Sequence, residues 1–297
     1  MFRNRRMVAI GLLVVLRLCL AIQHSPHHSS FDRATSGEES SRKKPNYMVQ
    51  ISAEFDDGSV SSCGGSLIAD RLISTAAHCV YSMDTQLTSA TVSVSNVNSD
   101  KDVFDIMSIY THPNYKMSFN ALDDFAILVL YDPVKLCAAP DYMFPVNLVM
   151  SAPDSSTSAL NKSSECWLRG WSEGNHTPRI LLDMPLNRHR WFYKSLFRFG
   201  QTAESKACDG DSGGPVVCRL PNGKQYQVGV AVGLESVDGN RTAGCSDKNL
   251  LAVLDLRKHG NFIREVLQRL SMSTSILDQG YGEIGRCVPR DHSDMFH

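Results

Sequence analysis

The stretch "KACDGDSGGPVVC", residues 206–218, decides the fold and poses the question of function. It places Ser212 after an aspartate and before two glycines, with a cysteine on either side. A serine attacks an acyl group only when a base takes its proton, a carboxylate orients that base and N–H groups hold the oxyanion. If Ser212 is a nucleophile, the rest of the chain must supply a base and a carboxylate.

Two further stretches contain both groups. "STAAHCV", residues 74–80, contains His78, and "NALDDFAILVL", residues 120–130, contains the adjacent Asp123 and Asp124. The three stretches follow one another in the order histidine, aspartate, serine. Any one of them could arise by coincidence, but together they predict an acyl-transfer site.

In this order, the stretches resemble those of the trypsin/chymotrypsin-like serine proteases, peptidase family S1. "CGGSLI" (63–68), "HPNY" (112–115) and "ECWLRGWSEG" (165–174) resemble further landmarks of that family. The resemblance runs from about Pro45 to Leu270. It implies an all-β fold of two six-stranded antiparallel β-barrels, with the active site between them and a C-terminal helix.

The apolar pattern agrees with this fold class. From Pro45 onward, short apolar runs rich in β-branched residues alternate with turn residues, which is typical of strands. "NFIREVLQRL", residues 261–270, instead places its apolar residues on one helical face and predicts a helix docked on the core. The runs of strand length are "YMVQIS", "GSLIADRLIST", "ATVSVSNV", "FAILVL" and "YQVGVAVGL".

The resemblance assigns a role to each site residue. Ser212 would attack the scissile carbonyl, and His78 would act first as general base and then as general acid. Asp124 would hold His78 in the required tautomer, and the backbone N–H groups of Gly210 and Ser212 would form the oxyanion hole. Asp211 would pair with the ammonium that activation creates. No metal ion or organic cofactor is implied.

Some assignments have competitors. Asp123 could orient His78 in place of Asp124, but the family pattern of Asp, apolar, Ala and two apolar residues fits "DFAIL" from Asp124. His112 in "THPNY" is a second histidine, to which the resemblance gives a structural role. Asp209 is interpreted as an exposed neighbour of the pocket rim.

The substrate pocket departs from the family pattern. Its floor corresponds to Lys206, where trypsin-like members have an aspartate and chymotrypsin-like members a serine. A lysine there would repel Arg and Lys side chains of a substrate, and it would either attract an acidic side chain or fill the pocket. The residues that align with the pocket wall are Val232, Gly233 and Leu234. Leu234 in place of a glycine should narrow the entrance.

The activation region also departs from the family. Residues 22–44 are polar and predict a pro-segment with Arg33 as the cleavage point. Cleavage there would expose Ala34 where the family has isoleucine, which has three more carbons, worth about 2.4 kcal/mol of apolar burial. None of the residues between Trp171 and Cys208 is cysteine, so the family's loop disulfide in this region is missing.

The chain begins like a secreted protein. Residues 1–21 combine a basic start with an apolar run, which predicts a cleaved signal peptide. Of nine cysteines, Cys19 lies in that segment and eight remain, an even number that suits disulfides in an oxidising compartment. Sequons for N-glycosylation begin at Asn161, Asn175 and Asn240. These features predict an extracellular glycoprotein.

The resemblance also pairs six of the cysteines. The remaining Cys137 and Cys287 have no standard partner, and we hypothesise that they bond to each other and tie the tail, residues 271–297, to the body. The implied disulfides are Cys63–Cys79, Cys166–Cys218 and Cys208–Cys245.

Charge and motifs together define the predicted function. The net charge of −1 gives no basic field for nucleic acid or anionic lipid. Residues 45–270 are predicted to form a protease domain, making the protein a secreted, monomeric serine endopeptidase that is not held at a membrane once the signal is removed. Its partners would be protein or peptide substrates, an activating protease and a protein inhibitor. The alternative is a weakly active or inactive homologue that binds another secreted protein. A carbohydrate-binding or structural β module would leave the three motifs unexplained.

Overall fold

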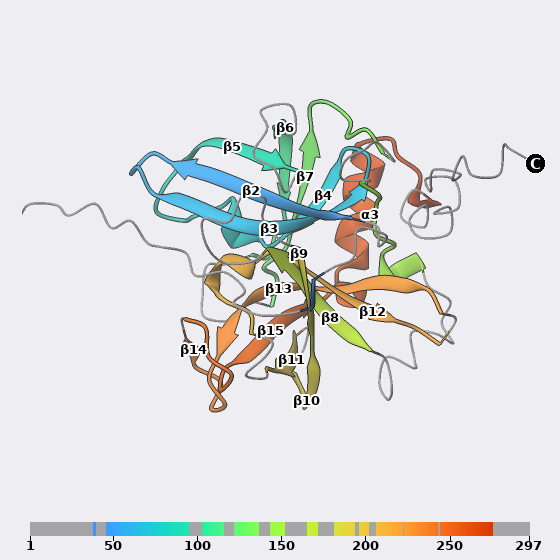
Figure 1. Ribbon diagram of the computed structural model, residues 1–297. Helices are drawn as coiled ribbons and strands as arrows, with labels where there is room; N and C mark the ends of the chain where they lie inside the picture. The colour runs from blue at the N-terminus through green and yellow to red at the C-terminus, as the bar shows by residue number, and fades with distance from the viewer. Residues whose placement is uncertain are drawn as a thin grey trace, which may run out of the picture. The chain divides into compact units, whose positions relative to one another are not determined.

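The structure is a computed structural model of the chain (Figure 1). The predicted signal peptide, Arg33, Cys137, Cys287 and the sequons at Asn161 and Asn175 lie outside the described residues. Among the described residues, no helix has the length and apolar character needed to cross a membrane. The structure describes residues 38–39, 46–94, 103–115, 122–136, 143–151, 165–171, 181–193, 196–201, 206–221, 223–242 and 244–275.

The N-terminal half of the described chain forms a closed six-stranded barrel in the order β2-β3-β4-β7-β6-β5. β7 corresponds to the apolar run "FAILVL", and all five of its residues are buried between β4 and β6. The run "GSLIADRLIST" is not one strand, because β3 ends and β4 begins on either side of a tight turn at Asp70 and Arg71. The strands are β2 (Met48–Phe55), β3 (Val60–Ala69), β4 (Leu72–Thr75), β5 (Leu87–Ser93), β6 (Val103–Thr111) and β7 (Ala126–Leu130).

The C-terminal half forms an antiparallel sheet in the order β1-β9-β8-β12-β13-β15-β11-β10, with β14 paired to β13. β9 and β10 are separated only by Leu186, yet they lie towards opposite ends of this path, so the sheet curls back on itself. The strands are β1 (Glu38–Glu39), β8 (Cys166–Trp171), β9 (Leu181–Pro185), β10 (Asn187–Tyr193), β11 (Leu196–Gly200), β12 (Pro215–Arg219), β13 (Gln225–Glu235), β14 (Arg241–Thr242) and β15 (Leu250–Asp255).

The predicted C-terminal helix is α3 (Gly260–Arg269), which follows the short 3-10 turn η6 (Leu256–Lys258). Its buried side chains repeat at helical spacing, as the sequence predicts. The Phe262 ring lies 5.8 Å from the Phe125 ring, so the helix packs against the residue that precedes β7. The prediction of an all-β fold with a C-terminal helix is confirmed. The buried helical residues are Gly260, Phe262, Ile263, Val266 and Leu267.

A buried polar network joins the barrel to the second sheet. The Gln227 carboxamide on β13 accepts from the Ser66 hydroxyl at 2.8 Å and donates to the Ser74 hydroxyl at 3.0 Å. Its backbone N–H donates to the carbonyl of Asn147 at 2.8 Å. All three polar side chains of the network are fully buried, where satisfied hydrogen bonds fix relative position most strongly. These bonds fix the position of β13 relative to β3 and β4, and His78 lies just after β4.

Candidate active site

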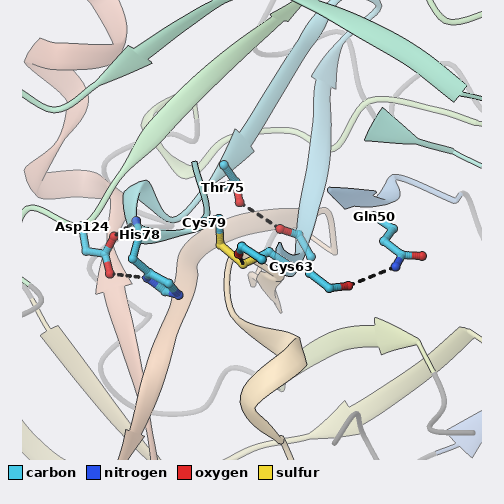
Figure 2. Close-up of a disulfide and its surroundings, with 9 residues drawn as sticks. Gln50, Cys63, Thr75, His78, Cys79 and Asp124 are labelled. Atoms are coloured by element: carbon cyan, nitrogen blue, oxygen red, sulfur yellow. Dashed lines mark hydrogen bonds and ion pairs between the residues drawn. A yellow bond between two sulfur atoms is a disulfide. The ribbon is translucent and has the colours of Figure 1, made fainter. Parts of the chain in front are cut away.

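The barrel brings His78 and Asp124 together at one end. β4 and β7 are paired neighbours with Thr75 opposite Ala126, so the residues after Thr75 and before Ala126 emerge side by side. His78 lies in the 3-10 turn η1 (Ala77–Cys79), and its Nδ1 is 2.7 Å from Asp124 Oδ2. Asp124 Oδ1 accepts the backbone N–H of His78 at 2.9 Å (Figure 2). One contact orients the ring and the other holds the backbone of the turn, and a carboxylate beside Nδ1 favours the tautomer with its proton on that nitrogen.

Asp123 faces a different partner. Its Oδ1 lies 3.5 Å from His112 Nδ1 and 3.6 Å from His259 Nε2. Of the two adjacent carboxylates, Asp124 is therefore the one that contacts His78, which agrees with the preferred reading of the motif. Burial lowers the pKa of His112 below its ordinary value, against the opposing pull of the Asp123 carboxylate.

The loop that carries Ser212 is pressed against the barrel. The Ser212 carbonyl accepts the Gly64 N–H at 2.7 Å, and the Gly213 N–H donates to the carbonyl of Ala231 at 2.7 Å. Gly213 has a φ of +80°, and a Cβ at this position would lie 2.3 Å from both the Gly64 carbonyl oxygen and the Thr75 hydroxyl. Only glycine meets both requirements, which explains the glycine after the serine in physical terms.

A disulfide completes the link between the serine and histidine segments. Cys63 precedes Gly64 and is bonded to Cys79, the residue after His78 (Figure 2). One hydrogen bond and one disulfide thus connect the Ser212 loop to the His78 turn. Among the described side chains, no direct hydrogen bond joins His78 to Ser212; in this class of site that bond commonly tightens only when substrate binds.

The residues assigned to the oxyanion hole lie in and after the 3-10 turn η5 (Asp209–Asp211). The Ser212 N–H is 3.4 Å from the Asp209 carbonyl, a long contact that holds the N–H only weakly. Gly210 lies at the centre of the turn. Asp209 is exposed, as predicted, and its side chain accepts the N–H of Gly244 at 3.1 Å.

Asp211 is a buried carboxylate directly before the serine. It is 3% exposed, and its Oδ2 accepts the N–H of Cys208 at 2.9 Å. Gly170 on β8 packs against it so closely that a Cβ there would lie 2.5 Å from Asp211 Oδ1. The carboxylate assigned to activation is therefore buried where η5 packs against β8.

Two loops that border the predicted pocket are joined by Gln201, which sequence reasoning missed. Its Oε1 accepts the N–H of Ala207, the residue after the half-buried Lys206. Its Nε2 donates to the carbonyls of Ser246 at 3.3 Å and Asn249 at 3.2 Å. These bonds hold the Lys206 loop next to the segment that leads into β15.

A pair of leucines stands at the predicted pocket wall. Leu234 on β13 lies directly opposite Leu251 on β15, and each is 2% exposed. Opposed residues of antiparallel strands project from the same face, so the two side chains lie next to each other. Val232 is also buried, and Gly233 has a φ of +149° at a shift of register. Leu251 was missed because only the register between strands reveals it.

The structure contains the three disulfides that the resemblance implies. Cys166 and Cys218 are opposed residues of β8 and β12. The Cys208–Cys245 bridge links the Ser212 loop to the segment before β15. The bonded pairs are Cys63–Cys79, Cys166–Cys218 and Cys208–Cys245.

The amino-acid sequence is similar to those of known proteins. The sequence model of the family described as Trypsin matches residues 34–250. The chain belongs to the trypsin family of serine proteases. Among relatives in this family, Serine protease 28 of Mus musculus is 32% identical over 198 residues, covering 58% of this chain and 68% of that protein. Trypsin-4 of Rattus norvegicus is 30% identical over 190 residues, covering 59% and 72%. Serine protease 7 of Drosophila melanogaster is 29% identical over 235 residues, covering 68% and 59%.

Proposed function

We propose that this trypsin-family chain is a secreted serine endopeptidase that hydrolyses peptide bonds through an acyl-enzyme on Ser212. The observation that carries the proposal is the pair of contacts, 2.7 and 2.9 Å, between His78 and the buried Asp124. This arrangement orients the imidazole for the role of a base, and the Ser212 loop is linked to the His78 turn through the Gly64 hydrogen bond and the Cys63–Cys79 disulfide. Secretion is inferred from residues 1–21 and from the disulfides, which persist in oxidising compartments.

The proposed reaction uses each group in turn. His78 Nε2 takes the proton of Ser212 as its Oγ attacks the carbonyl carbon, and the resulting oxyanion is held by the N–H groups of Gly210 and Ser212. His78 then gives the proton to the leaving amine as the carbon–nitrogen bond breaks. Water, deprotonated by the same imidazole, attacks the ester, releases the carboxylic acid product and regenerates Ser212. Asp124 stabilises the imidazolium in both halves.

Activation is proposed to follow cleavage after Arg33. The family match begins at Ala34, the next residue. Glu38 in β1 pairs with β9, which pairs with β8, where Gly170 packs against Asp211. β1 and β8 lie two strand spacings apart, which is about 9.5 Å. The four residues before Glu38 can span about 13 Å when extended. The new ammonium of Ala34 therefore has enough chain to reach Asp211.

The proposed substrate preference follows from the two large side chains at the predicted pocket wall. Leu234 and Leu251 oppose each other in buried positions, so the pocket should accept a small side chain at the cleavage site. Lys206 should disfavour Arg and Lys in that position.

The second candidate function is a weakly active or inactive homologue that binds another secreted protein. It is favoured by the same leucine pair, Leu234 and Leu251, and by Ala34 as a small activation anchor. These features affect substrate entry and activation, while the His78–Asp124 pair keeps its geometry.

An organophosphonate that reacts with activated serines separates the two functions. The protein is cleaved after Arg33, treated with the probe and mapped by peptide mass spectrometry. For the endopeptidase we expect one adduct at Ser212 that disappears in both Ser212→Ala and His78→Ala. Complete cleavage at Arg33 without an adduct would favour the binding homologue.

A further inference from the structure

A cluster of two histidines and a carboxylate lies outside the residues that the proposed mechanism uses. His112 follows β6, Asp123 comes just before β7 and His259 directly precedes α3. One ligand atom from each lies within 4.8 Å of the others. The His112 and His259 rings meet edge to face with centroids 5.2 Å apart. The two ends of the β6–β7 connection and the start of α3 thus bring metal-ligating atoms close together.

His259 has more acceptors than a neutral ring can satisfy. Its Nδ1 is 3.0 Å from the carbonyl oxygen of Asp255, and its Nε2 is 3.1 Å from the carbonyl oxygen of Leu122. A neutral imidazole carries a single N–H, so it can donate to only one of these oxygens. The side chain is 2% exposed, and Asp123 Oδ1 also lies 3.6 Å from Nε2. Nε2 therefore faces two oxygens, and a positive ion bound at this nitrogen would interact favourably with both.

His112 adds a lone pair to the same point. The backbone N–H of Asn114 donates to its Nδ1 at 3.4 Å, a long contact that marks this nitrogen as an acceptor and that a metal ion bound there would replace. The same nitrogen lies 3.5 Å from Asp123 Oδ1. An imidazole lone pair and a carboxylate thus face each other, and a shared positive ion would turn this repulsion into attraction.

We propose that His112, Asp123 and His259 bind one Zn²⁺ ion. Two imidazoles and one carboxylate form a ligand set that zinc favours. A tetrahedral zinc with ligands at about 2.0–2.1 Å holds neighbouring ligand atoms about 3.3 Å apart. The distances from Asp123 Oδ1, 3.5 and 3.6 Å, need little adjustment to reach that value.

The surroundings of the cluster suit a metal site. The His259 Nδ1–H donates to the Asp255 carbonyl, as the free N–H of a zinc-bound histidine usually does. The Asp123 side chain is 34% exposed, which gives the ion and a fourth ligand from solvent a route of entry. Bound zinc would join α3 to the connection between β6 and β7. This site is independent of whether Ser212 is catalytic.

Cobalt titration tests the proposal on the full chain. The parent protein carries His78→Ala, so that the ring next to Asp124 cannot compete for metal, and is freed of metal by chelation and dialysis. Co²⁺ is added and its visible absorption recorded, and Zn²⁺ is then added to displace it. We expect one equivalent of bound Co²⁺ with the strong absorption of a low-coordinate site, and a melting temperature that rises with added ZnCl₂ because the ion binds only the native state.

Two substitutions identify the ligands. Asp123→Asn and His112→Gln should remove the strong absorption and weaken Zn²⁺ binding at least about tenfold, with the zinc-dependent rise in melting temperature lost as well. Asp132→Asn, which changes an exposed carboxylate elsewhere on the barrel, should leave all three measurements unchanged. The proposal is overturned if the parent shows no such absorption, or if its absorption and zinc affinity persist in Asp123→Asn and His112→Gln, as they would for metal bound at other histidines.

Discussion

The end of the barrel that holds His78 and the wall formed by β13 and β15 differ in how far they keep the family pattern. At the barrel end, Asp124 contacts His78 twice, at 2.7 and 2.9 Å. At the wall, Leu234 and Leu251 oppose each other, and Lys206 occupies the position that the sequence assigns to the pocket floor. Cleaving a peptide bond requires a fixed geometry of a few catalytic atoms. The side chains on β13 and β15, in contrast, can be substituted while the backbone pairing of the two strands stays the same. The two tasks of a protease are therefore free to diverge separately within one fold.

Removing the orienting carboxylate should have the largest effect on the barrel end. We expect Asp124→Asn to lower kcat about 10⁴-fold, a value taken from the triad of this family, because the amide favours the wrong tautomer of His78. Steady-state hydrolysis of a peptide by protein cleaved at Arg33 measures this. The exposed Asp132→Asn is the matched control and should retain full activity. A loss below tenfold in Asp124→Asn would mean that another group orients the ring.

The second sheet contains a buried ion pair between β8 and β9, one residue from Gly170, which packs against Asp211. Arg169 on β8 donates to Asp183 on β9 at 2.6 and 2.9 Å, and its side chain is 1% exposed. Arg169→Met leaves the Asp183 charge buried and should cost about 3–5 kcal/mol of unfolding free energy, measured in urea. The double variant Arg169→Met/Asp183→Leu should recover most of that loss. A single variant as stable as the parent protein would show that the pair is not needed.

Gly213 lies where the two regions meet and tests the packing of the serine loop. Gly213→Ala introduces a Cβ 2.3 Å from two oxygens at a φ of +80°. We expect a loss of about 3 kcal/mol from overpacking and backbone strain. Gly239→Ala has a similar φ of +87° with nothing within 4 Å, so it measures the backbone strain alone and should cost about 1 kcal/mol. Equal losses would remove the close contact from the explanation.

Replacing the two leucines of the β13–β15 wall by smaller residues should have the smallest effect on activity, and it tests whether the wall sets substrate preference. We expect Leu234→Gly combined with Leu251→Gly to raise kcat/KM for substrates with a large apolar side chain by about 10-fold, relative to alanine at the same place. A peptide series that varies only that side chain measures the ratio. Thermal melting of the double variant controls for the cavity it creates. An unchanged ratio would mean that the leucines do not border the pocket.

Sequence alone predicted the features that short stretches encode. The order of the three motifs predicted His78, Asp124 and Ser212 as site residues, of which the structure brings His78 and Asp124 into contact, and the helical periodicity of residues 261–270 predicted α3. The stretch of residues 65–75 reads as one strand because it is apolar on both sides of Asp70 and Arg71, but these two residues form a turn between two strands.

Features set by contacts between distant segments could not be predicted. Leu251 faces Leu234 only through the register of β13 and β15. Gln227 meets Ser66 across 161 positions of sequence, and His259 meets Leu122 across 137. A local sequence pattern does not specify such pairs, because it does not say which distant residue each of these side chains will contact.

The most direct test measures turnover of a randomised peptide library by protein cleaved after Arg33, with new amino termini counted by mass spectrometry. Our interpretation predicts cleavage products with a small side chain before the broken bond. It predicts none with Ser212→Ala, and a loss of about 10⁶-fold with His78→Ala. Products that persist in Ser212→Ala, or their absence from the fully processed protein, would contradict it.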